Sequence, residues 1–353
     1  MPEPATLPIP AIGSPAPARR HRGRARARLI LQTAAGLALL GFWVHTVPIS
    51  MVWRNARPHH LWPLALIALC TLASALLRAG RWKLILRPIR DVPALDLFWI
   101  NSAGNLVNYL LPLRAGDAIR FWWVGRRHPI PGGACLASMI VDKLFDLAAM
   151  VAFLVPVAGL ELALHGRGDP LARVLGVAAA APALTLIGLL AAVTLGPRLI
   201  LWTPVSSRLR PGVRRTIHQQ SGWFRAATSS IGGGRRLGVL GLMTGAALIS
   251  DGLAFSLLFT ALDIHLSYVA AMAGSIGITI SYGLPAAPGY VGNVEVAGSM
   301  VLATGLGLQR AVAAGAVLLW HVLAAMMVVC LGLVALSRLN MTGPARSLAA
   351  RLP

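Results

Sequence analysis

The sequence is poor in charged residues and poorest in acidic ones. Charged residues make up 12% of its 353 residues, where soluble domains have about 25%, and this deficit argues against a soluble enzyme. Acidic residues number 11 against 32 lysines and arginines, a net charge of +21, while 56% of the chain is hydrophobic and the mean hydropathy is +0.70. Nucleic-acid-binding proteins are also basic, but they are not this apolar. The composition predicts a multi-span membrane protein with basic loops and no nucleic-acid partner.

Motifs for catalysis and cofactor binding are missing as well. The three cysteines, Cys70, Cys135 and Cys330, show neither a disulfide framework nor a metal-ligand spacing. There is no Gly-x-Ser-x-Gly motif, no phosphate-binding loop and no dinucleotide fingerprint. We therefore predict that the protein is not an enzyme and has no metal or cofactor. A membrane-embedded transferase is the least favoured function, because a nucleophile or metal set is lacking.

Apolar runs of about 20 residues, the length that crosses a bilayer, occur eight times. They cover residues 29–49, 61–77, 134–158, 174–195, 237–262, 268–284, 289–306 and 315–336. A further apolar stretch, 94–111, carries Asp96 and three asparagines and ends before Pro112. Such polar backbone at membrane depth is tolerated only inside protein or beside a cavity, so this stretch is predicted to be re-entrant. The expected fold is an all-α membrane protein with about eight transmembrane helices and one or two re-entrant segments.

The distribution of basic residues predicts the orientation. With the N-terminus in the cytoplasm and 94–111 not crossing, 26 of the 32 lysines and arginines lie inside, five lie outside and Lys143 lies within a span. This bias predicts a multi-pass protein of the cell (inner) membrane with both termini cytoplasmic. The chain then divides into a basic tail (1–28), a membrane domain (29–340) and a second tail (341–353). The basic loop 196–236 is predicted to be an amphipathic stretch at the membrane interface.

Two breaks in the apolar pattern are alike. Residues 109–116 and 282–289 share the pattern Tyr-x-Leu-Pro-x-x-x-Gly, and an acidic residue follows each, Asp117 and Glu295. Proline removes a backbone donor and glycine permits a reversal, so each motif should interrupt a helix. The helix-breaking residues are Pro112, Gly116, Pro285, Pro288, Gly289 and Gly292. Paired breaks in two halves of a chain suggest an internal repeat and are typical of a transporter site at the membrane midplane.

Ionisable side chains inside predicted spans are costly and need a reason. Asp142 and Asp146 share a helix face, and Lys143 can pair with Asp146. This group either locks helices together through a salt bridge or lines a polar cavity. Asp251, alone in its span, either lines a cavity or accepts a hydrogen bond from a neighbour such as Ser250.

Further candidates stand beside the two breaks. Glu295 lies in the first turns of its predicted helix, where the positive helix end favours a carboxylate, next to a break that would admit water or a head-group. His321 is either a satisfied buried histidine or a proton carrier. Arg114 and Arg120 either pair with Asp117 or hold a phosphate group with the planar guanidinium fork.

Three segments resemble the motifs of a known family. Residues 108–120 (NYLLPLRAGDAIR), beginning at Asn108, resemble the Asn…Pro-x-Arg-x-Gly-Glu-x-x-Arg signature of the flippase-like membrane domain of lysylphosphatidylglycerol synthases. Residues 141–146 (VDKLFD) are similar to its Glu-Arg-x-x-Asp motif, and 284–295 (LPAAPGYVGNVE) to its Leu-Pro-x-x-Pro-Gly-x-x-Gly-x-x-Glu motif. The motifs occur in the family's order, and the resemblance covers roughly 30–340. It implies eight spans, re-entrant segments and a polar cavity open to lipid; a second re-entrant break would make 289–306 part of a hairpin.

The departures from the family pattern are specific. Asp117 and Asp142 replace glutamates and Lys143 replaces an arginine, so charge is kept. His321 stands where the family often has arginine, which puts that position's role in doubt. The chain ends at Pro353 without the aminoacyl-transferase domain of bifunctional members, so the resemblance implies the translocation part alone.

Two functions of different classes follow. In the first, the protein moves a lipid or lipid-linked head-group between leaflets, with membrane lipids that are anionic or phosphate-bearing as partners. Asn108, Arg114, Asp117, Arg120, Asp142, Lys143, Asp146 and Glu295 are then the candidate lipid-binding residues. In the second, it is a non-transporting accessory or scaffold for an enzyme of envelope lipid, polyprenoid or glycolipid metabolism, as the basic loop 196–236 would allow. A partner enzyme and a second copy of the chain remain open as partners.

Overall fold

The computed structural model describes residues 19–111, 115–166, 170–195, 222, 233–282 and 287–339. Throughout these residues the regular elements are helices. The α-helices are Arg19–Thr46 (α1), Ile49–Asn55 (α2), Trp62–Leu86 (α3), Ala94–Leu110 (α4), Ala115–Arg127 (α5), Gly132–His165 (α6), Pro170–Thr194 (α7), Gly234–Ala261 (α11), Tyr268–Ser281 (α12), Asn293–Met300 (α13) and Arg310–Arg338 (α14), with a 3-10 turn at Pro288–Tyr290 (η1) and a π-helical turn at Val301–Gly305 (η2).

Four of the described helices, α3, α6, α11 and α14, are long and apolar enough to cross a membrane. The α1–α2 pair, bent by 90°, makes a fifth if it is one span. These helices coincide with the predicted spans 61–77, 134–158, 237–262, 315–336 and 29–49. The all-helical membrane fold is therefore confirmed, whereas a total of eight spans is not.

The remaining three predicted spans look different in the structure. Helix α7 has 25 residues, of which Ala178–Ala192 forms a short apolar stretch. Helix α12 has 14 residues, so it is about 21 Å long and falls short of a hydrocarbon core of about 30 Å. The predicted span 289–306 is divided among η1, α13 and η2, because Gly289 and Gly292 adopt left-handed backbone angles (φ 75° and 84°) that end a helix.

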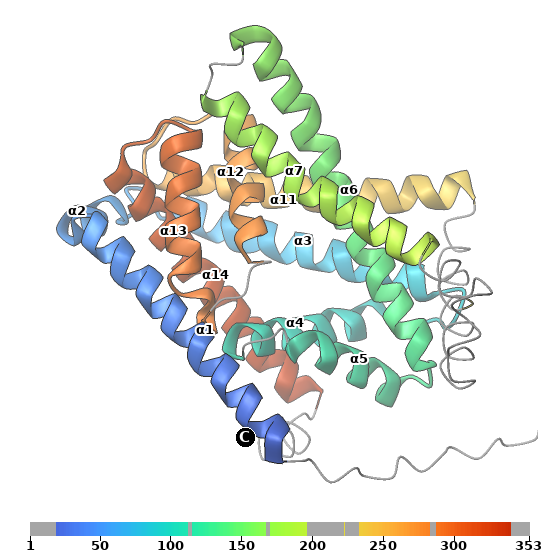
Figure 1. The fold of residues 1–353 in the computed structure, drawn as a ribbon. Helices are drawn as coiled ribbons and strands as arrows, with labels where there is room; N and C mark the ends of the chain where they lie inside the picture. Colours follow the sequence, from blue (N-terminus) through green and yellow to red (C-terminus); the bar gives the residue numbers. More distant parts are fainter. Residues whose placement is uncertain are drawn as a thin grey trace, which may run out of the picture.

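Helices α3 and α11 form the centre of the bundle. They run side by side through the middle of the molecule, while α6 and α7 form a hairpin that extends beyond it (Figure 1). The helix that contains the predicted span 61–77, α3, continues to Leu86 and buries Trp82 and Ile85. The span was cut at Arg78, the first charged residue, yet the structure neutralises that charge within the bundle.

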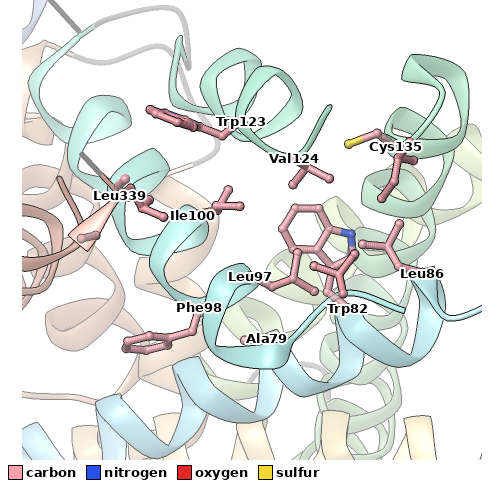
Figure 2. Close-up of a cluster of buried hydrophobic side chains, with 14 of the residues drawn as sticks. Ala79, Trp82, Leu86, Leu97, Phe98, Ile100, Trp123, Val124, Cys135 and Leu339 are labelled. Atoms are coloured by element: carbon pink, nitrogen blue, oxygen red, sulfur yellow. The ribbon is translucent and has the colours of Figure 1, made fainter. Parts of the chain in front are cut away.

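A hydrophobic cluster joins α3 to α4, α5, α6 and α14. Trp82 lies at its centre among Leu86, Leu97 and Val124, all at most 2% exposed (Figure 2). The indole N–H of Trp82 donates to Ser138 Oγ on α6 at 3.0 Å, so this large side chain is buried without an unsatisfied polar atom. The cluster holds the α4–α5 segment against the long helices.

The α4–α5 segment is an antiparallel helical hairpin. A Cβ on Gly104 would lie 2.5 Å from Arg120 Nε, and one on Gly116 would lie 1.8 Å from the carbonyl oxygen of Gly104. Gly104 thus faces Arg120 and Asn108 faces Gly116, so later positions in α4 meet earlier positions in α5, as in an antiparallel pair. Glycine at 116 is required because the two backbones touch there. The 94–111 stretch, helical from Ala94 to Leu110, is therefore one arm of a hairpin, and Tyr109 and Leu110 lie at the end of that arm.

A second helical hairpin is formed by α12 and α13. A Cβ on Gly277 would lie 2.9 Å from Val301, and one on Gly298 would lie 3.4 Å from Ile278 Cδ1, so the two helices are antiparallel. Asn293 closes the hairpin by donating from Nδ2 to the carbonyl oxygen of Ser281 at 2.7 Å. The two predicted helix breaks consequently lie at the tips of two hairpins, although an internal repeat is not confirmed.

Candidate functional site

The tips of the two hairpins meet at His321 of α14. The Tyr109 hydroxyl, at the end of α4, is 3.4 Å from His321 Nε2, and the same nitrogen is 2.8 Å from the carbonyl oxygen of Gly289. The Tyr109 and Tyr290 rings also lie with centroids 6.1 Å apart. Two sequence motifs 173 residues apart are thereby brought into one place by a third helix.

Glu295 pairs with His321 in this site. Its Oε1 is 2.5 Å from His321 Nδ1, and its Oε2 accepts the backbone N–H of Gly292 at 2.7 Å. Both side chains are almost fully buried, with 6% and 7% exposed. The carboxylate also caps α13, where the exposed N–H groups of the first turn favour negative charge. His321 was left open as a buried histidine or a proton carrier, and it proves to be the buried partner of a carboxylate.

The first hairpin is closed by its own polar residues. Asn108 Oδ1 accepts the backbone N–H of Gly116 at 2.7 Å, and Asn108 Nδ2 donates to Asp117 Oδ1 at 3.3 Å. Arg120 donates to Asp117 at 3.0 Å and also to Asn105 Oδ1. Arg120 thus makes the ion pair with Asp117 that was one of its two predicted roles. Asn105 was noted only as a polar residue, and its contact with Arg120 was not predicted.

A second polar site lies between α3, α6 and α11, around Arg81. The Arg81 side chain is fully buried and donates from Nε to Asp142 and from Nη2 to Asp146, both at 2.8 Å. Its Nη1 donates to Thr244 Oγ1 on α11 at 3.1 Å. The planar guanidinium thus satisfies groups on two helices at once. Arg81 was not among the predicted site residues, because it was placed in a cytoplasmic loop.

Three further charges form the outer part of this second site. Arg78 donates from Nη2 to Asp251 at 2.8 Å and lies 3.5 Å from Asp146 through Nε. Lys143 Nζ lies 3.3 Å from Asp146, as predicted, but its side chain is 57% exposed. One alternative for Asp251 was a hydrogen bond from a neighbour such as Ser250, but the Ser250 hydroxyl donates to the carbonyl oxygen of Ala246. Arginines from α3 therefore supply positive charge to the partly buried aspartates of α6 and α11.

The predicted site residues accordingly fall into two groups. Glu295 and His321 lie at the meeting of the hairpin tips, while Asn108, Asp117 and Arg120 close the first hairpin behind it. Asp142, Lys143 and Asp146 belong to the second group, with Arg78, Arg81 and Asp251. The predicted residues Pro112, Arg114 and Pro285 lie outside the described residues.

Comparisons with known proteins agree with these features. The family model for the lysylphosphatidylglycerol synthase TM region matches residues 29–332. A curated relative, the glycosyltransferase AglD of Haloferax volcanii, is 33% identical over 150 residues, which cover 41% of this chain and 23% of that protein. The chain thus matches less than a quarter of the length of this relative. Because the family model covers nearly all of the membrane domain with both hairpins, the chain belongs to the family of the lysylphosphatidylglycerol synthase TM region.

Proposed function

We propose that this protein is not an enzyme but moves a lipid, or a lipid-linked head-group, between the leaflets of the cell membrane. The observation that carries the proposal is the meeting of two hairpin tips at a buried polar site, formed by Tyr109, Gly289, Glu295 and His321. Broken helices that expose backbone groups within a bundle are how membrane proteins build polar sites at depth. Both termini are proposed to be cytoplasmic, as the basic residues indicate.

The polar groups of the described site are paired with one another, so a head-group has to exchange with existing partners. At the first hairpin, a lipid phosphate would compete with Asp117 for the Arg120 guanidinium. At the second polar site, around Arg81, the accessible charges are Lys143, Arg78 and Asp251. Their side chains are 57%, 29% and 35% exposed, respectively. A phosphate-bearing head-group with a cationic or hydroxyl group would match this mixture of signs.

A proteoliposome assay with fluorescent phospholipids tests the proposal. The wild-type protein should move label between leaflets, and the double variant Arg114→Ala/Glu295→Ala should lose most of that movement. The control Arg57→Ala/Asp91→Ala removes one basic and one acidic residue from exposed positions and should behave as wild type. Equal lipid movement by the wild type and the first double variant would refute the assignment.

A second function, that of a membrane accessory to an enzyme of glycolipid metabolism, is supported by one observation. The relative that matches this chain over 150 residues bears the name of a glycosyltransferase, and the match covers only 23% of it. In this function, the membrane domain of this chain would hold such an enzyme at the membrane. Stable co-purification of this protein with a glycosyltransferase, together with absence of lipid movement in liposomes, would favour this function over transport.

A further inference from the structure

His321 lies between two hydrogen-bond acceptors. Its Nδ1 is 2.5 Å from Glu295 Oε1, and its Nε2 is 2.8 Å from the carbonyl oxygen of Gly289. A carbonyl group and an ionised carboxylate can only accept, and a neutral imidazole has a single N–H to donate. Both short contacts are satisfied only if the Glu295–His321 pair holds one proton more than a neutral imidazole beside a carboxylate. This holds whether the extra proton resides on the ring or on the carboxyl group.

Tyr109 offers His321 an alternative partner. Its hydroxyl, which can donate or accept, is 3.4 Å from the same Nε2 that faces Gly289. When the pair loses its extra proton, Nδ1–H still donates to Glu295, and Nε2 presents a lone pair. That lone pair repels the Gly289 carbonyl oxygen and accepts the Tyr109 O–H. After the loss of one proton, His321 therefore no longer binds the second hairpin through Gly289 and instead binds the first hairpin through Tyr109.

In the described part of the site, the titratable groups are Glu295, His321 and the tyrosines around them. Glu295 comes from α13 and Tyr109 from α4; Tyr290 of η1 lies against Tyr109, and Tyr282 lies against Tyr290 with ring centroids 4.9 Å apart. From α11, the apolar Phe255 packs on Trp320, the neighbour of His321. With 7% of its side chain exposed, His321 is nearly closed off from water.

We propose that the Glu295–His321 pair is the binding site for a coupling proton, an inference that rests on the proposed lipid movement. The proton-loaded pair holds the tip of the second hairpin to α14 through Gly289. When that proton is released to water, His321 Nε2 exchanges the Gly289 carbonyl oxygen for the Tyr109 hydroxyl as its hydrogen-bond partner, and the tip is freed. Proton uptake restores the contact with Gly289. Acidic conditions thus favour the held tip, and alkaline conditions favour the freed one.

Distance measurement between the hairpins tests the site without any lipid substrate. Spin labels are placed at Leu110 and Thr279, which are exposed positions near the two tips, after Cys70, Cys135 and Cys330 are changed to serine. The full chain is measured by pulsed electron–electron double resonance in lipid nanodiscs from pH 5 to pH 10. The expected result is a shift from one distance population to another as the pH rises.

Two variants make the result specific to the pair. His321→Arg keeps a cation beside Glu295 that does not titrate in this range, so it should hold the acidic-state distance at every pH. Tyr109→Phe removes only the alternative partner of the proton-free imidazole, so its transition should move to higher pH. A single wild-type distance population from pH 5 to pH 10, or a transition in His321→Arg at the wild-type pH, would overturn the proposal.

Coupling is tested separately in proteoliposomes with an imposed pH gradient. Wild-type lipid movement should change several-fold when the gradient is reversed, and the His321→Arg variant should lose this dependence. If the distance change occurs but no lipid moves, the transport function fails while the proton site stands. If lipid moves at the same rate with and without a gradient, the coupling role is refuted and the transport function stands.

Discussion

Arg78 of α3 and Asp251 of α11 form an ion pair, with Nη2 and Oδ2 2.8 Å apart, although 173 positions separate them in the chain. Arg78 also reaches Asp146 of α6 at 3.5 Å, so one side chain connects three helices. Beside it, Arg81 connects the same three helices through Asp142, Asp146 and Thr244. The centre of the bundle is therefore joined by charge as well as by apolar packing.

Replacement of Arg81 by methionine should destabilise the protein far more than replacement of Lys143. Arg81 is fully buried and compensates two aspartates, whereas Lys143 is 57% exposed. Removing one partner of a buried ion pair costs about 3–5 kcal/mol, while an exposed pair contributes about 0–1 kcal/mol. Thermal unfolding in detergent should show a large loss for Arg81→Met and a small one for Lys143→Met. Equal losses of thermal stability in the two variants would mean that the burial of Arg81 does not determine how much its ion pairs stabilise the protein.

Removing the whole Arg81 group should be milder than removing Arg81 alone. The variant Arg81→Met/Asp142→Leu/Asp146→Leu leaves neither carboxylate uncompensated, and apolar side chains can pack in their place. Its unfolding temperature should lie well above that of Arg81→Met. Lipid movement measured on the same variant then separates the two roles of the cluster. Retained movement indicates a structural bridge, and lost movement in a stable protein indicates contact with head-groups.

Alanine at position 116 should open the first hairpin. Its Cβ would lie 1.8 Å from the carbonyl oxygen of Gly104 and 2.7 Å from Asn108 Oδ1, so the α4 and α5 backbones would have to separate. Overpacking of this kind costs about 1–3 kcal/mol. The matched control is Gly125→Ala on the same helix, where the nearest atom is 4.0 Å away. Limited proteolysis should show faster cleavage near the hairpin in Gly116→Ala only.

Glycines 292 and 307 provide a matched pair at the second hairpin. Both have left-handed backbone angles, with φ of 84° and 69°, so alanine is strained at either position. A Cβ on Gly292 would also meet the carbonyl oxygen of Gly36 at 2.1 Å, whereas one on Gly307 would meet open space. Gly292→Ala should therefore reduce thermal stability and lipid movement more than Gly307→Ala. Similar losses in both would show that strain, and not contact with α1, is the requirement.

Asn108→Ala should loosen the first hairpin without a steric clash. The change removes the acceptor of the Gly116 N–H and the donor to Asp117, two hydrogen bonds worth about 1 kcal/mol each. Hydrogen exchange at the first turn of α5 should become faster, while exchange at α12 and α13 should not change. Unaltered exchange at Gly116 would contradict a closing role for this asparagine.

Much of the fold and part of the site could be predicted from the sequence. The buried aspartates were identified because a charge in an apolar run is costly. Their partners were missed because the predicted span stopped at Arg78, the first basic residue after the apolar run. One signal was available. The predicted spans contain three aspartates, Asp142, Asp146 and Asp251, but a single lysine or arginine, Lys143, so arginines at the end of a neighbouring helix were required.

The second hairpin shows where sequence patterns reach their limit. Residues 268–284 and 289–306 are each apolar enough to resemble a span, and hydropathy does not register whether the backbone continues or turns back. The motif at 282–289 predicted a break, but not that its tip would lie against His321 and Tyr109. Such a contact depends on how α14 packs between the two hairpins, which the local residue pattern does not encode.

The short second hairpin also has a consequence for topology mapping. A hairpin that turns back inside the membrane and a pair of full crossings both return the chain to the side on which it started, so the parity of crossings is the same. Reporter tags at either terminus, or in the 263–267 and 306–309 connections that flank the hairpin, would give identical answers for both arrangements. Only the segment around Pro288 differs, because two crossings would place it in the cytoplasm and the hairpin places it against α14. Labelling of a cysteine at that segment by a membrane-impermeant reagent is thus the measurement that distinguishes them.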